Sequence, residues 1–100
     1  MKVFYHEKLE VYGHAINFVA MANVTAERLP RGRKYLADQV HRASSSIPLN
    51  IAEGAGEFAP KEKARFYRMA RRSGTECAAI LDVCKKLALI EDRGRKTLRR

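Results

Sequence analysis

The stretch RASSSIPLNIAEG at residues 42–54 constrains the fold of this chain more than any other segment. Its serines and its proline are typical of a loop, since proline removes a backbone hydrogen bond inside a helix. Apolar or small residues nevertheless recur at helical spacing through it, as Leu36, Val40, Ala43, Ile47, Ile51 and Gly54. At about 100° per residue, all of these positions fall within an arc of roughly 80°. The pattern therefore predicts one helix from about residue 33 to residue 54, bent at Pro48.

The rest of the chain is also helical in pattern, and no segment has the alternation that predicts a strand. Apolar spacing predicts helices over residues 7–26 and 60–87, and Leu-Pro-Arg-Gly at 29–32 predicts the first turn. Asp92 is positioned to begin a fourth, short helix. Residues 1–100 are thus expected to form a single all-α domain, an antiparallel up-down four-helix bundle whose fourth helix is short or truncated.

The first predicted helix has an unusually wide apolar surface. One line of residues at helical spacing contains Leu9, Tyr12, Ile16 and Val19, and a second contains Val11, Ala15, Phe18 and Ala22. A helix in a monomeric bundle needs only one narrow apolar face. The width therefore predicts a second contact surface, such as an interface with another subunit.

The charge of the chain limits its partners. Twenty Lys and Arg residues against eleven Asp and Glu residues give a formal net charge of +9. This charge favours anionic partners, nucleic acid first and a membrane surface second. No apolar run is long enough to cross a membrane, and the start MKVFYHEKLEVY is unlike a signal peptide, so no membrane partner and a cytoplasmic location are expected.

The two cysteines fit this location. On one helix, Cys77 and Cys84 would lie about 10 Å apart, which is too far for a disulfide between them. They are expected to be buried thiols in a reducing compartment.

Basic residues form a row on the third predicted helix. Lys61, Arg65, Arg68, Arg72 and Lys86 fall within an arc of roughly 60°, away from the apolar line. Arg71 and Lys85 add charge nearby, as does the tail with Arg93, Arg95, Lys96, Arg99 and Arg100. Arginine suits phosphate contact because its donors form a fork. A solvated helix face is also usually charged, so phosphate binding and solvation both remain open. The candidate nucleic-acid-binding residues are Lys61, Arg65, Arg68, Arg71, Arg72 and Lys86.

A polar edge borders the apolar face of the second predicted helix. It consists of Gln39, Arg42, Ser46, Asn50 and Glu53, with Glu76 facing it from the third helix. Antiparallel pairing about a turn near residue 57 places position 42 beside about 72 and position 39 beside about 75. Because Glu76 borders the core of the third predicted helix in this region, an ion pair between Arg42 and Glu76 is predicted. Ser46 and Asn50 would be partly buried and would need hydrogen-bond partners, because an unpaired buried polar group costs ~1–3 kcal/mol. The favoured interpretation is that this edge fixes helix register or a subunit contact; a ligand site is the alternative.

No catalytic constellation is evident. His6, Glu10 and His14 are spaced by four residues, but His6 and His14 drift apart around a helix and form a poor metal set. GAGEF lacks the Lys-Ser/Thr ending of a phosphate-binding loop, and Ser44–Ser46 lack a nucleophile elbow. We therefore expect a protein that is not an enzyme, with no catalytic residue, no cofactor and no bound metal.

Several of these residues together resemble a known family. The similarity runs through Leu9-Glu-Val-Tyr12, Leu29-Pro30, Tyr35-Leu36, Gln39-Val-His-Arg42-Ala, Ser46-Ile-Pro-Leu-Asn50-Ile-Ala-Glu53-Gly54, Phe66, Ala70-Arg71, Ser73 and Glu76. The chain resembles the four-helix-bundle proteins of the 23S ribosomal RNA intervening-sequence family, which are sometimes labelled ribosomal proteins. It is more distantly similar to the accessory proteins of diversity-generating retroelements. The resemblance covers roughly residues 9–90, and its most specific part is Ser-Ile-Pro-x-Asn-Ile-Ala-Glu-Gly.

The resemblance implies an up-down four-helix bundle that assembles as a homo-oligomer, a ring-shaped homopentamer. It also implies binding of RNA or DNA without an established catalytic role, and it makes a reverse transcriptase or another protein a candidate partner. Family members usually carry a long fourth helix, whereas few residues follow the third predicted helix here.

Two functions follow from the sequence. The leading hypothesis is a non-enzymatic helical-bundle oligomer that binds nucleic acid through basic helix surfaces. The alternative is a protein-interaction scaffold whose basic face meets an acidic partner without direct nucleic-acid contact.

Overall fold

The computed structural model describes residues 5–91, which fold into helices with no strand in that range. The elements are η1 (Tyr5–Lys8), α1 (Glu10–Glu27), η2 (Arg31–Arg33), α2 (Lys34–Ala55) and α3 (Pro60–Lys86). The prediction of three long helices is confirmed. Only the start of the first helix differs by several residues, because Leu9 has an extended backbone (ψ 125°) that separates the 3-10 turn of η1 from α1.

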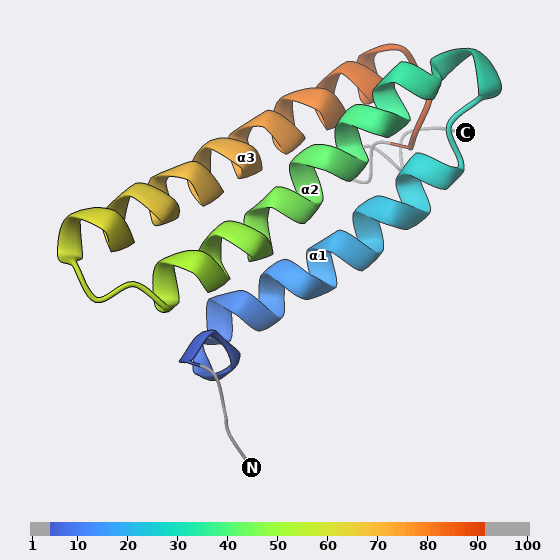
Figure 1. Cartoon of the computed structure of the whole chain (residues 1–100). Helices are drawn as coiled ribbons and strands as arrows, with labels where there is room; N and C mark the ends of the chain where they lie inside the picture. Colours follow the sequence, from blue (N-terminus) through green and yellow to red (C-terminus); the bar gives the residue numbers. More distant parts are fainter. Residues whose placement is uncertain (1–4, 92–100) are drawn as a thin grey trace.

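The three long helices lie side by side with α2 in the middle (Figure 1). Successive helices are antiparallel, and α2 packs on both of its neighbours. Within residues 5–91, α1 and α3 have no Cα atoms within 8 Å of each other. The helix α2 is therefore the element on which the other two are assembled.

The predicted helix through Pro48 is continuous in the structure. Pro48 is buried inside α2, and Ile51 beyond it stays buried on the same side as Val40 before it. The hydroxyls of Ser44 and Ser45 donate to the carbonyl oxygen of His41, at 3.3 and 2.8 Å. The serines thus place their hydroxyls against the helix backbone in the turn before the proline.

The core lies where α2 meets the other two helices. Its buried residues include Leu36, Val40 and Ala43 from α2, Cys77, Ile80 and Cys84 from α3, and Ala22 and Ala26 from α1. The buried side of α1 is thus lined by alanines, with Ala15 as a third member. Ile16, from the predicted 3-4-3 line, is 43% exposed and lies outside this core. Alanines allow close approach to α2, which leaves bulkier residues at the flanks of the contact.

The fourth predicted helix is not found in the described residues, which contain three long helices. The helix α3 ends in a left-handed turn at Ala88 (φ 61°), where Leu89 N–H donates to Cys84 O at 2.9 Å and Ala88 N–H to Lys85 O at 2.9 Å. These bonds satisfy carbonyls that a helix end leaves free. Leu89 and the next residue then pack back on the core. Asp92 and the rest of the predicted fourth helix lie outside the described residues.

The opposite end of α3 secures the end of α2. Lys63 Nζ donates to the carbonyl oxygens of Gly54 and Ala55 at 3.0 and 3.3 Å, and it lies 5.9 Å from the Tyr67 ring centroid. A cation at a helix C-terminus is favourable because the helix dipole is negative there. This cap was not predicted from the sequence, because the lysine belongs to the following helix.

Candidate nucleic-acid interface

The predicted ion pair between α2 and α3 is present in the structure. Arg42 Nη2 lies 2.7 Å from Glu76 Oε2. Both side chains are partly open to solvent, with exposed fractions of 65% and 42%. The pair therefore aligns the two helices at a surface rather than in the core.

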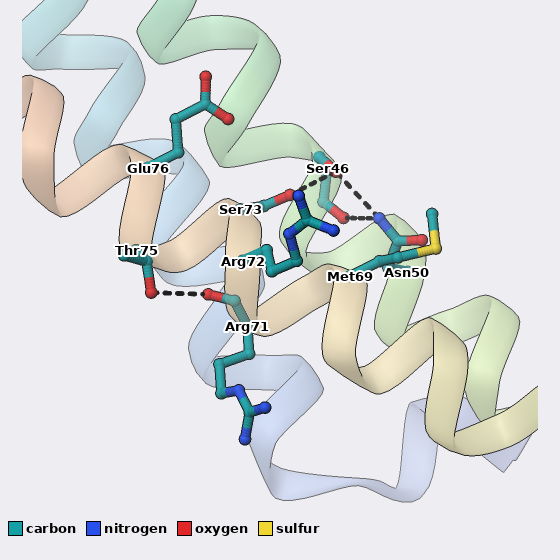
Figure 2. A pocket seen from close by; sticks show the side chains of 8 residues that line it. All are labelled: Ser46, Asn50, Met69, Arg71, Arg72, Ser73, Thr75 and Glu76. Carbon is teal, nitrogen blue, oxygen red and sulfur yellow. Dashed lines mark hydrogen bonds between the residues drawn. The ribbon is translucent and has the colours of Figure 1, made fainter.

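The predicted partners of Ser46 and Asn50 come from the same two helices. Ser73 Oγ donates to Ser46 Oγ at 2.8 Å, which links α3 to α2. Asn50 Nδ2 donates to Ser46 O at 2.8 Å and to Ser46 Oγ at 2.9 Å (Figure 2). Gln39 and Glu53 are exposed, and within residues 5–91 their side chains form no hydrogen bond or ion pair. The polar edge thus has a bonded centre, in which hydrogen bonds join Ser46, Asn50 and Ser73, whereas Gln39 and Glu53 at its two ends are exposed.

A cleft opens beside this bonded centre. It has a volume of about 630 Å³, and polar residues from both helices make up most of its lining. Its lining residues are Ser46, Asn50, Met69, Arg71, Arg72, Ser73, Thr75 and Glu76 (Figure 2). Met69, Ser73 and Thr75 were not among the candidate site residues predicted from the sequence. One sequence signal could have revealed the cleft. Short polar side chains occur on α3 at Ser73 and Thr75, opposite the polar Ser46 and Asn50 of α2.

The predicted basic residues of α3 are all exposed. Arg65 is engaged locally: its Nη2 lies 2.9 Å from Glu62 Oε1, and its Cζ lies 4.5 Å from the Phe66 ring centroid. The side chains of the other five form no ion pair or hydrogen bond within residues 5–91; these are Lys61, Arg68, Arg71, Arg72 and Lys86. We call these five residues the free basic row. The predicted basic residues from Arg93 onward lie outside the described part.

The free basic row and the cleft meet at two arginines. Arg71 and Arg72 line the cleft, whereas Lys61, Arg68 and Lys86 do not. Figure 2 shows the Arg71 side chain directed away from the Ser46–Asn50 group. Arg72 is therefore the residue that joins the row to the polar centre of the cleft.

A second, apolar groove follows the other flank of α3. Its volume is about 740 Å³, and all three long helices contribute to it. The lining residues are Leu9, Val11, Ile47, Ile51, Tyr67, Ala70, Arg71, Gly74, Thr75 and Ala78. Since α1 and α3 do not touch through their backbones, this groove lies in the space between them over α2.

The outward surface of α1 carries no formal charge over most of its length. Residues 11–26 contain no Asp, Glu, Lys or Arg. Large apolar side chains on this segment are solvent-exposed, including Val11 at 55%, Met21 at 65% and Val24 at 50%. We call the exposed apolar side chains of residues 11–26 the neutral α1 surface.

The residues considered for metal or nucleophilic chemistry do not assemble into a site. Within residues 5–91, no group of three or more His, Cys, Asp or Glu side chains is placed to hold a metal ion. His6 packs edge-on against Tyr12, with ring centroids 4.7 Å apart. Burial raises the pKa of the Cys77 and Cys84 thiols, and for Cys77 the nearby Glu76 carboxylate adds to this rise while Arg42 opposes it. A raised pKa suppresses the reactive thiolate.

No helix among the described residues has both the length and the apolar content needed to span a lipid bilayer.

Together, the helices and their surfaces define a small, strongly basic, all-α protein with a neutral flank on α1 and a basic flank on α3. Comparison with family profiles gives a match over residues 7–100 to the family described as 23S rRNA-intervening sequence protein. The chain belongs to this family, as its resemblance predicted. The family description names no enzymatic activity. Comparison with curated proteins gives no match.

Proposed function

We propose that this protein is a non-enzymatic helical oligomer that binds RNA or DNA through the basic surface of α3. The observation that carries the proposal is the free basic row, whose five exposed cations have no acidic partner within residues 5–91. Lysine and arginine side chains contact phosphates regardless of sequence, and this contact supplies most non-specific affinity for nucleic acid.

The spacing of the basic residues of α3 favours phosphate binding over mere solvation. Lys61, Arg65, Arg68 and Arg72 follow each other at intervals of three or four residues along α3. Like charges at such intervals destabilise a helix by roughly 0.2–0.5 kcal/mol per pair. Among these four residues, only Arg65 forms an ion pair that offsets the repulsion, with Glu62. A bound polyanion would remove this repulsion, whereas a solvated face would more commonly mix both signs of charge.

Salt-dependent binding tests this proposal. Fluorescence anisotropy would measure the affinity of the full chain for labelled structured RNA and for duplex DNA at several salt concentrations. If about five phosphates are neutralised, the plot of log affinity against log salt has a slope near −4 to −5 for duplex DNA. The double variant K61Q/R68Q should make this slope shallower by about 2. Absence of binding at low salt would contradict the proposal.

The neutral α1 surface supports self-association. Two copies of a chain with net charge +9 repel each other over most of their surface, but not where charge is absent. Residues 11–26 provide such a region, and its exposed apolar side chains gain from burial. The resemblance to oligomeric relatives implies a pentameric ring, and light scattering would measure the number of subunits.

The apolar groove supports a four-helix arrangement. In an up-down bundle, a fourth helix packs against the first and third helices. The groove between α1 and α3 is the corresponding position, and its apolar walls need cover from water. A fourth helix packed there would complete the up-down bundle that the sequence predicts.

The alternative function is a scaffold that binds protein and not nucleic acid. The same apolar groove favours it, because amphipathic helices bind in grooves of this kind. A reverse transcriptase or another protein with an acidic surface is the candidate partner. The two functions differ in the anisotropy experiment, since a pure scaffold shows no affinity for RNA or DNA at low salt. We place either activity in the cytoplasm, where the unpaired Cys77 and Cys84 stay reduced.

A further inference from the structure

We propose that the polar cleft between α2 and α3 binds one unpaired nucleotide, so that the protein prefers single-stranded RNA or DNA to a duplex. This inference rests on the proposed function, because the free basic row must hold the strand that supplies the nucleotide. The cleft volume of about 630 Å³ lies in the range of small-molecule sites. The cleft is thus large enough for a base with its sugar.

The position of the cleft relates it to a bound strand. Arg72 belongs both to the free basic row and to the cleft wall. A backbone that follows Lys61, Arg68 and Arg72 along α3 therefore passes the mouth of the cleft. One base of such a strand can turn inward while its phosphates stay on the row.

The hydrogen-bonding groups of the cleft leave both a donor and an acceptor for a base. Asn50 Nδ2 donates to both the carbonyl oxygen and the hydroxyl oxygen of Ser46. The Oδ1 atom of Asn50 forms no hydrogen bond in the described residues, so it can accept one. Ser46 Oγ accepts from Ser73 and Asn50, which leaves the Ser46 hydroxyl proton to donate. The Watson–Crick edge of a base presents such donors and acceptors only when the base is unpaired.

Two longer side chains of the cleft can contact the face of a base. The guanidinium of Arg72 is exposed and unpaired within residues 5–91, and its plane can stack on a base. Met69 adds an exposed apolar thioether on the same wall. These groups provide stacking without sequence preference, because every base has a π face.

A duplex does not satisfy this site. Its bases are stacked on each other, and their pairing edges are occupied, so a base enters the cleft only after it is unpaired and unstacked. The free basic row can still bind the duplex backbone. The cleft therefore adds affinity for a single strand alone.

A matched pair of variants tests the proposal. R72Q and R68Q each remove one charge from the same exposed face of α3, but only Arg72 lines the cleft. Anisotropy would compare a labelled 12-nucleotide oligouridylate, the corresponding oligothymidylate and a 12-base-pair duplex. Wild type should bind the single strands about tenfold more tightly than the duplex, a ratio at the low end of what stacking of one base on an aromatic side chain supplies. R72Q should abolish the preference, and R68Q should weaken single strands and duplex by the same factor.

A second variant probes the polar centre directly. N50A removes the Oδ1 acceptor, and it should reduce the single-strand preference while duplex affinity stays unchanged. Circular dichroism and urea unfolding would show whether N50A is folded. R72Q is expected to fold like wild type, because the Arg72 side chain forms no hydrogen bond or ion pair within residues 5–91.

The outcomes separate the two proposals. If wild type binds single strands and duplex equally, and R72Q and R68Q have equal effects, the cleft proposal is wrong and the basic row remains supported. If wild type binds none of the three probes at low salt, the proposed function and the cleft proposal both fail.

Discussion

Arg42 on α2 and Glu76 on α3 form an ion pair of 2.7 Å across the edge of the polar cleft. Because both side chains are partly exposed, water and salt screen the pair. A double-mutant cycle with R42A and E76A should give a coupling energy of about 0.5–1 kcal/mol from urea unfolding at low salt. The coupling should decline in high salt.

The Lys34–Asp38 pair provides a control for this cycle. It lies within one helix at 3.2 Å, with exposed fractions of 79% and 62%. Its coupling should be about 0.3–0.5 kcal/mol. A zero coupling for Arg42–Glu76 would show that the contact does not stabilise the α2–α3 packing.

Gly54 is required because α3 leaves no room for a side chain. A Cβ atom at this position would lie 2.7 Å from Tyr67 Cε1 and 3.2 Å from Phe66 Cβ. G54A should lower the free energy of unfolding by about 1–3 kcal/mol, because the Phe66 Cβ is fixed to the helix backbone and cannot yield as easily as a side-chain tip. Urea unfolding would measure the loss.

Gly13 is the matched control for Gly54. It lies inside α1, and a Cβ atom added there would have no neighbouring atom within 4 Å outside its own helix backbone. G13A should stabilise the protein by about 0.5–1 kcal/mol through helix propensity. Equal effects of G13A and G54A would mean that the close packing at Gly54 is unimportant.

Ala88 adopts a backbone conformation that favours glycine, with φ at 61°. The left-handed region costs a residue with a Cβ atom roughly 1–2 kcal/mol. A88G should therefore raise the free energy of unfolding by about 0.5–1 kcal/mol, the gain being reduced by the greater freedom of glycine in the unfolded chain.

Ala79 allows a direct comparison, because it is exposed inside α3. A79G should destabilise the protein by about 1 kcal/mol. Thermal unfolding would show shifts of opposite sign for A88G and A79G. A lower melting temperature for A88G would contradict the role of the left-handed turn in ending α3.

The sequence was sufficient to predict α2 and its contact with α3. The apolar positions of α2 keep one phase across Pro48, which only a continuous helix explains. The short turn before Pro60 makes α2 and α3 antiparallel neighbours. Counting about this turn placed position 42 near residue 72, and Glu76, one helical turn further on, was the acid that borders the core. Both inferences depend on local spacing, which a sequence displays directly.

Other features depend on distances between helices, which spacing does not give. Alanines bury the contact side of α1 because α2 lies close to it, although larger residues such as Ile16 have more to gain from burial. The cleft exists because Ser73 and Ser46 are short enough to meet at 2.8 Å. The turn at Ala88 was missed because the usual sequence signal for it is glycine.

The buried thiols make stability depend on pH. The pKa values of Cys77 and Cys84 are raised in the folded protein, chiefly by burial. Above about pH 8.5, cysteines of the unfolded chain lose their protons while the folded protein retains them. The unfolded state then binds fewer protons, so the free energy of unfolding decreases as pH rises.

Urea unfolding at pH 7.5, 8.5 and 9.5 would measure this decrease. The double variant C77A/C84A is less stable at every pH because it loses buried volume, but its stability should fall less steeply with pH. An identical slope in wild type and the double variant would assign the pH dependence to other groups.

The neutral α1 surface predicts where subunits meet. Val24 is 50% exposed in the segment that contains no Asp, Glu, Lys or Arg. V24K would place a desolvated charge in an apolar interface between copies, which is costly without a partner. Light scattering should show a wild-type mass of several chains and a V24K mass that falls toward the 11.4 kDa of one chain.

A79K adds the same charge to the exposed face of α3 and should leave the mass unchanged, because that face already carries the free basic row. A wild-type monomer, or equal dissociation by both variants, would rule out α1 as the interface, because a charge on α1 would then have no greater effect than a charge on α3.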